Sequence, residues 1–186
     1  MRIRIVSNLL VIGFIKSALL SASTFASDKA PFKYVWGTAH HILPKTHSDE
    51  SGYFSLCEGN DGRIYVGTAK YNHNAYLVEF DPVTTEQRIV IDAHKICGLD
   101  AKGYAAQAKI HTRNFVGPSG IIYVGTKQGY AKEGDNSKYP GGYLITYDPR
   151  NDKSSNLGMP YKEQGIADVV ADEDRGLIYV VTCEDQ

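Results

Sequence analysis

Three polar residues near the middle of the chain have types and spacing that could do chemistry. They lie in the stretch Gln107-Ala108-Lys109-Ile110-His111-Thr112-Arg113-Asn114. Alternate residues of a strand face the same way, so we expect His111 and Arg113 on one face with Lys109 at its entrance. A histidine beside such cations could bind a carboxylate or phosphate, or act as a base with a lowered pKa. His111 and Arg113 are therefore the candidate catalytic residues. The open alternative is that both only hydrogen-bond to neighbouring strands.

Candidate ligand-binding residues accompany this stretch. Lys127, Gln128 and Tyr130 open a long polar loop, and Gln164 precedes the next apolar run. With Lys109 they offer charge, amides and an aromatic ring, which can stack on a sugar. His111 and Gln164 could also contribute to a divalent-metal site.

A second polar cluster lies closer to the N-terminus. Its members are His40, His41, His47, Asp49 and Glu50. Their side chains suit zinc or manganese, but the spacing matches no recognised motif, and a solvated connector is the alternative. The segment 70–74 (Lys-Tyr-Asn-His-Asn) is predicted to be a turn, because asparagine tolerates positive φ.

One pattern recurs along the chain and indicates the elements that position these residues. Gly-x-Ile-Tyr-Val-Gly-Thr begins at Gly62 and at Gly120, and a degraded form begins at Gly176. The Ile-Tyr-Val cores start at residues 64, 122 and 178, so the spacings are 58 and 56 residues. Repeats of this length made of short strands are typical of β-propeller blades. From this pattern we predict an all-β fold made of four-stranded antiparallel blades.

The chain has room for about two and a half blades. The strands predicted from apolar runs and turn residues place the blades at about 53–91, 110–157 and 165–186, the last one truncated. In each blade, the loop that enters the innermost strand and the loop between the second and third strands are expected on the same face. From Ile64 to Asp81 is 17 residues and from Ile122 to Asp148 is 26, so the second blade carries a nine-residue insertion there. Function usually lies on such loops.

The N-terminal segment has the features of a secretory signal. Residues 1–26 carry Arg2 and Arg4, an interrupted apolar run and small residues before a cleavage site after Ala26. We therefore expect a periplasmic or secreted protein, with no membrane association after cleavage. Residues 27–52 are expected to form a connector, with a possible closing strand at 34–37.

Composition narrows the classes of partner. The 186 residues have a formal net charge of −1 and no basic or acidic block, which argues against nucleic acid. Three cysteines, Cys57, Cys97 and Cys183, allow at most one internal disulfide; three unpaired thiols are the alternative. We expect a small molecule or carbohydrate as ligand, and further blades from a longer chain or from other subunits.

The repeated strand and the Tyr-Leu-x-x-Phe/Tyr-Asp-Pro strand that follows it resemble those of bacterial exported β-propeller repeat proteins. Their wider superfamily includes quinoprotein-like, kelch-like and lyase propellers, and the likeness covers about residues 53–183. Some propeller lyases, including those similar to oligogalacturonate lyase, hold a divalent metal with His and Gln side chains. By this resemblance His111 and Gln164 would be two of those ligands, and the others would lie beyond Gln186.

Two functions remain open at this point. The first is an exported binding propeller whose channel-face loops hold a small molecule, glycan or protein. The second is a metal-dependent polysaccharide lyase or hydrolase of propeller type. Binding is preferred because this stretch does not complete a catalytic set.

Overall fold

A computed structural model of the chain describes residues 37–46, 50 and 55–183. The expected signal segment, most of the connector and closing strand, His47, Asp49 and residues 53–54 lie outside the described residues. The chain divides into a unit of residues 1–41 and a unit of residues 42–186. Residues 37–41 of the first unit contain no helix or strand, and the elements below all belong to the second.

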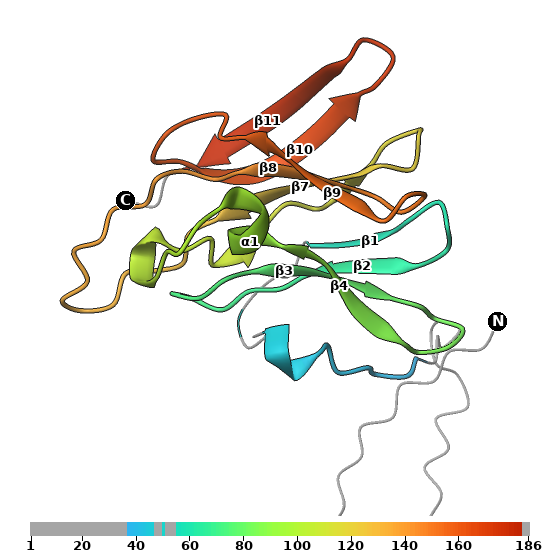
Figure 1. Cartoon of the computed structure of the whole chain (residues 1–186), viewed down its shortest axis with the longest axis horizontal. Helices are drawn as coiled ribbons and strands as arrows, with labels where there is room; N and C mark the ends of the chain where they lie inside the picture. Colours follow the sequence, from blue (N-terminus) through green and yellow to red (C-terminus); the bar gives the residue numbers. More distant parts are fainter. Residues whose placement is uncertain (1–36, 47–49, 51–54, 184–186) are drawn as a thin grey trace, which may run out of the picture. The chain divides into compact units, whose positions relative to one another are not determined.

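The first sheet is a four-stranded antiparallel meander (Figure 1). Its strand order follows the chain: β1 (Leu56–Glu58), β2 (Ile64–Gly67), β3 (Tyr76–Phe80) and β4 (Gln87–Asp92). The second motif residue, Tyr65, pairs with Cys57 on β1 and with Glu79 on β3. A short helix, α1 (Ala93–Cys97), follows β4 directly; the Asp92 side chain caps it by accepting a hydrogen bond from the Lys95 backbone amide.

The second sheet repeats this order with a divided first strand. Its strands are β5 (Lys109–Ile110), β6 (Phe115–Val116), β7 (Ile122–Lys127), β8 (Leu144–Asp148) and β9 (Lys153–Gly158). Both β5 and β6 pair with β7, and all pairs are antiparallel. The third sheet is a hairpin of β10 (Gly165–Asp172) and β11 (Leu177–Cys183). Two 3-10 turns complete the elements, η1 (Pro44–Thr46) and η2 (Gly103–Ala105).

The prediction of an all-β, antiparallel fold is confirmed. The three Ile-Tyr-Val segments lie in β2, β7 and β11, which belong to three different sheets. Within the described part of the chain, no helix is long and apolar enough to cross a membrane.

The first strand of the second blade, expected to begin at about residue 110 and to carry His111 and Arg113 on one face, is broken, and this part of the prediction is wrong. Residues 111–114 leave the ladder, and Asn114 takes a positive φ of 51°. Its side-chain oxygen accepts hydrogen bonds from Ser55 Oγ at 2.9 Å and from Thr112 Oγ1 at 3.3 Å. The buried Asn114 thus connects the break in the strand to Ser55, next to the first sheet. The simple alternation expected for His111 and Arg113 does not hold across this break.

The second sheet is covered on both faces by two apolar clusters. On one side it meets the first sheet, in a core that contains Tyr65, Leu77, Ile122 and Val124. On its other side it meets the hairpin. That core contains Tyr123, Leu144, Ile166, Val169 and Ala171. Because both faces are buried, β7 is buried along its whole length.

The loops between strands gather at one end of the sheets, here called the loop end. It is the end where β2, β4, β7 and β9 finish and β3, β5, β8 and β10 begin. Backbone hydrogen bonds join neighbouring sheets there, from Lys70 N to Ala108 O at 3.0 Å and from Gly142 N to Gln164 O at 2.8 Å. Adjacent sheets are therefore locked together at the loop end, where the polar loops were expected to meet.

Candidate functional site

Two buried lysines mark the loop end of the second sheet. Lys109 opens β5 and Lys127 closes β7, and the two are direct cross-strand partners. Residues paired in this way project from the same face of a sheet. Lys109 is only 4% exposed and Lys127 only 7%. Lysine is seldom buried to this extent, so two lysine side chains share a protected position at the loop end.

Two tyrosine rings flank one of these lysines. The Lys109 Nζ atom lies 5.1 Å from the ring centre of Tyr71 and 5.5 Å from that of Tyr130. The two rings meet edge to face, with centres 5.0 Å apart. Tyr71 comes from the β2–β3 turn, whereas Tyr130 comes from the β7–β8 loop and is largely exposed. The ammonium group thus lies within cation–π distance of both rings.

A buried amide completes what we call the Lys109 cluster: Tyr71, Lys109, Lys127, Gln128 and Tyr130. Gln128 is fully buried, and its Oε1 atom has no hydrogen-bond partner within the described part of the chain. The start of β10 packs tightly here, since a Cβ on Gly165 would come within 2.3 Å of Lys127 Cγ and 2.7 Å of Gln128 Oε1. Only glycine fits such a close approach.

The structure therefore brings four of the predicted ligand-binding residues together. They are Lys109, Lys127, Gln128 and Tyr130. The fifth, Gln164, adjoins the cluster through the chain, because its carbonyl oxygen accepts the Gly142 amide and it directly precedes Gly165. Tyr71 was not predicted. A signal was available, since a tyrosine follows the motif threonine by three residues in the first copy and by four in the second.

His111 and Arg113, the two predicted catalytic residues, lie in different surroundings. His111 is half-buried just after β5, and its backbone amide donates to Gly125 O at 3.1 Å. Arg113 is exposed and forms an ion pair with Asp168 on β10, donating through Nε at 3.1 Å and also through Nη2. This pair holds the pKa of the Asp168 carboxyl below its usual value. Arg113 thus links the second sheet to the hairpin.

The histidines do not assemble into a metal centre in the residues that can be placed. Over 37–46, 50 and 55–183, no three His, Cys, Asp or Glu side chains gather as metal ligands would. Glu50 instead accepts a hydrogen bond from the Tyr71 backbone amide. His94 accepts one from the Gln107 amide at 3.0 Å through Nε2, and burial lowers the pKa of its imidazole.

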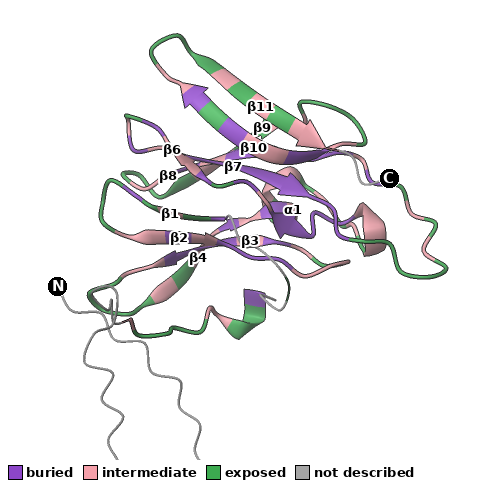
Figure 2. Cartoon of the chain, turned by 180° about the vertical axis from the view of Figure 1, so that it is seen from behind, coloured by how far each residue is buried: buried purple, intermediate pink, exposed green. Residues whose placement is uncertain are grey.

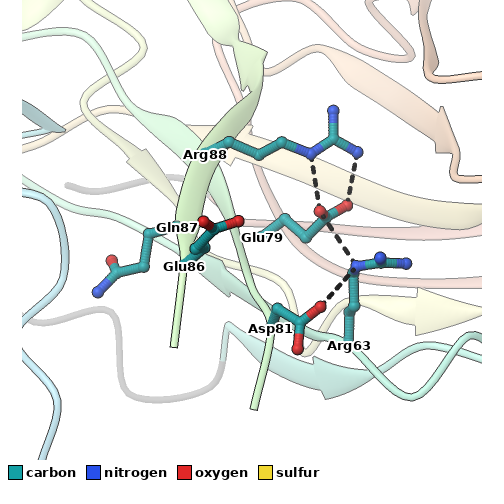
Figure 3. A pocket seen from close by; sticks show the side chains of 6 residues that line it. All are labelled: Arg63, Glu79, Asp81, Glu86, Gln87 and Arg88. Carbon is teal, nitrogen blue, oxygen red and sulfur yellow. Dashed lines mark hydrogen bonds and ion pairs between the residues drawn. The ribbon is translucent and has the colours of Figure 1, made fainter. Parts of the chain in front are cut away.

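A charged pocket of about 430 Å³ lies away from the loop end. Figure 3 shows its lining: Arg63, Glu79, Asp81, Glu86, Gln87 and Arg88. Glu79 is nearly buried and accepts two hydrogen bonds from Arg88, at 2.7 and 2.9 Å. Arg63 Nε lies 3.4 Å from Glu79 and 3.6 Å from Asp81. Arg88 also donates to Tyr147 of the second sheet at 2.7 Å. The charged side chains of this pocket therefore pair with one another, and Arg88 connects the first sheet to the second.

Comparison of the chain with known protein families, with curated proteins and with solved structures found no match.

Proposed function

We propose that the protein is an exported β-propeller binding module that holds a small molecule or glycan at its loop end. Its sheets would be the blades of an incomplete propeller, with further blades supplied by a longer chain or by other subunits. Support comes from the antiparallel strand order of the first two sheets and from the face-to-face cores on both sides of the second.

The observation that carries the proposal is the Lys109 cluster. Two nearly buried lysines and two tyrosine rings come from three separate segments that the fold brings to one end. Protection from solvent strengthens the contact between an ammonium group and an anion. An exposed tyrosine ring offers a surface on which another ring can stack. A ring-shaped ligand with an acidic group, such as an acidic sugar, meets both requirements.

The experiment is a binding titration by calorimetry with two probes, a hexuronic-acid oligosaccharide and a neutral hexose oligosaccharide of equal length. We expect binding of the acidic probe only, weakening as salt rises. Lys109→Met keeps the apolar stem but removes the charge. Because a hydrogen bond to a charged group contributes about 1.5 kcal/mol or more, this variant should lose roughly tenfold or more in affinity.

Matched controls are available on the same surface. Lys132→Met removes an exposed lysine from the same loop, and Tyr161→Ala removes an exposed tyrosine from the next connection. Neither should change the affinity, whereas Tyr130→Ala should weaken it. Failure of both probes to bind, or equal losses in the controls, would refute the proposed site.

Metal analysis addresses the alternative of a metal-dependent polysaccharide lyase or hydrolase, with His111 and Gln164 as ligands. A divalent ion that copurifies with the protein and is lost in His111→Ala would favour that alternative over simple binding. Unchanged metal content in the variant would count against His111 as a ligand.

A further inference from the structure

The β7–β8 loop lies against the chain segment that leads into β5. We call this segment, residues 103–107, the entry segment; it consists of η2 and the next two residues. Its Tyr104 amide donates to Asp135 Oδ2 at 2.7 Å, and its Ala105 amide donates to Ser137 Oγ at 3.2 Å. Asp135 and Ser137 both belong to the loop. Two backbone amides of the entry segment therefore hold the middle of the loop.

Gln107, the last residue of the entry segment, contacts the loop through its side chain. It is fully buried. Its Oε1 atom accepts hydrogen bonds from Thr126 Oγ1 at 2.6 Å and from Tyr139 Oη at 2.7 Å, and its Nε2 atom donates to Gly141 O at 3.0 Å. Tyr139 and Gly141 are near the end of the loop, whereas Thr126 lies on β7, a strand that is buried along its whole length (Figure 2). One amide side chain thus joins the end of the loop to the strand before it.

The backbone of Gln107 is fixed independently of the loop. Its carbonyl oxygen accepts the Ala75 amide at 2.9 Å, and its own amide donates to His94 Nε2 on α1 at 3.0 Å. Ala75 immediately precedes β3 of the first sheet. Lys109 follows two residues later and forms a β-bridge with Ala69. Gln107 and Lys109 therefore share one fixed stretch of backbone, and the Gln107 side chain holds the loop to it.

Tyr130 depends on the loop for its place in the Lys109 cluster. It is 60% exposed, yet its ring meets the Tyr71 ring edge to face and its ring centre lies 5.5 Å from Lys109 Nζ. An exposed side chain gains little from packing, so its position follows from the course of the backbone that carries it. The contacts between the loop and the entry segment set that course.

We propose that Gln107 is a positioning residue for ligand binding: it holds the β7–β8 loop in one course and thereby keeps the Tyr130 ring beside Lys109. The consequence for the ligand rests on the proposed function, whereas the placement of Tyr130 can be measured without a ligand. A loop held in this way forms a wall of the site before the ligand arrives. Binding then avoids the entropic cost of ordering the loop, which favours affinity.

Nuclear magnetic resonance of the ligand-free protein tests the placement of Tyr130. Protons above an aromatic ring resonate upfield, so the two tyrosines beside the Lys109 ammonium group should shift its ε-protons upfield. Tyr130→Ala should move this signal downfield. Gln107→Met keeps the length of the side chain but removes its hydrogen bonds to the loop, so it should move the signal in the same direction. An unchanged Lys109 signal in Gln107→Met overturns the proposal, whether or not the protein binds the sugar.

Calorimetry with the hexuronic-acid oligosaccharide tests the consequence for binding. Gln107→Met should weaken binding about fivefold, as the loss of one well-placed contact does. Added to Tyr130→Ala, the same substitution should change the affinity by less than about twofold, because an absent ring cannot be misplaced. Losses that multiply in the double variant would show that Gln107 acts only through general stability, and would overturn the proposal.

Tyr139→Phe keeps the test decisive if Gln107→Met does not fold. It removes only the hydroxyl that donates to Gln107 Oε1, so it should move the Lys109 signal in the same direction by a smaller amount. If only this variant folds, an unchanged signal in it overturns the proposal.

Tyr147→Phe is the matched control. Tyr147 is fully buried, donates to Asp152 at 2.8 Å and pairs with Ile122, at the end of the second sheet opposite the loop end. Its loss should lower stability while the Lys109 signal and the affinity stay unchanged. A wild-type protein that binds neither oligosaccharide would refute the proposed function alone, because the Lys109 signal still decides whether Gln107 places Tyr130.

Discussion

Asn72 and Asn114 show how single residues shape the loop end. Both have positive φ, 67° and 51°, which asparagine tolerates better than most residues. The predicted turn at 70–74 is confirmed, and it carries Tyr71 into the Lys109 cluster. The strand break at Asn114 could not be predicted, because its partner Ser55 lies 59 residues away in the chain. Local preference is visible in a sequence, whereas such a long-range partner is not.

At the same scale, His94 should make stability depend on pH. Its Nε2 must be unprotonated to accept the Gln107 amide, and burial lowers the pKa of the folded imidazole below the ordinary 6.5, outweighing the charges of Asp92 and Asp100. As pH falls through 6.5, the unfolded chain takes up the proton first, so the free energy of unfolding should fall as the pH drops through and below this value. Urea denaturation at a series of pH values measures this slope.

His94→Ala should remove that part of the slope. At pH 8 it should also lower the free energy of unfolding by about 1–2 kcal/mol, because the Gln107 amide loses its acceptor. His40→Ala, at an exposed position of the first unit, is the matched control and should keep the wild-type slope. A slope that persists in His94→Ala would assign the effect to another group.

The cysteines give a second residue-scale prediction. All three are free, which bears out the alternative of unpaired thiols, and burial raises the pKa of Cys57 and of Cys97 to about 12 each. Since the thiolate is the reactive form, both should resist iodoacetamide at pH 8 in the folded protein. Peptide mass spectrometry after timed labelling measures this, with labelling in urea as the control. Rapid native labelling of either residue would contradict the assigned burial.

At the scale of elements, the burial of the motif strands explains why their positions could be predicted from the sequence. Ile122 and Val124 belong to one core and Tyr123 belongs to the other, so these successive positions of β7 all need apolar side chains. That continuous apolar pattern allowed the strand positions and the antiparallel class to be predicted. Helix α1 was not predicted, because five residues are too few to show a helical period.

The motif glycine should be sensitive to a single methyl group. A Cβ on Gly125 would lie 2.3 Å from Ile166 Cγ2 and 2.8 Å from Thr112 Cγ2, so β10 can approach β7 only when this residue is glycine. Gly125→Ala should therefore cost about 1–3 kcal/mol of stability, as overpacked cores do. Chemical denaturation measures the loss.

A double-mutant cycle identifies the cause of that loss. Ile166→Ala removes the crowded Cγ2 atom and is destabilising by itself, because it leaves a cavity. If the two residues clash as the geometry indicates, the double variant should lose less stability than the sum of the single losses, by about 0.5 kcal/mol or more. Additive losses would show that the clash lies with the atoms that Ile166→Ala retains or leaves untouched, Ile166 Cβ at 2.6 Å and Thr112 Cγ2 at 2.8 Å, rather than with Ile166 Cγ2.

The candidate site was partly visible in the sequence. Lys109, Lys127, Gln128 and Tyr130 were selected because the repeat predicts which loops share one face. The separation of Arg113 from that group was not visible, because it depends on the break after β5 and on Asp168, 55 residues away. A repeat therefore predicts which segments meet, whereas the side-chain partners across sheets can be identified only from the structure.

At the scale of the whole second unit, the second sheet is the only one enclosed by two apolar cores among the residues that can be placed. Backbone amides exchange with solvent through local or global opening, so protection should follow this layering. We expect the slowest hydrogen exchange in β7 and β8 and faster exchange in β11, where Leu177, Tyr179 and Val181 are exposed and which pairs with β10 alone in the described part.

Mass-spectrometric hydrogen exchange measures this order. Equal protection of β7 and β11 would mean that β11 is covered in solution by another part of the polypeptide or by a second molecule, and protection of β11 that grows with protein concentration would identify a second molecule. Tyr179→Lys should leave the protection of β7 unchanged, since Tyr179 does not reach the core around Ile122 and Val124.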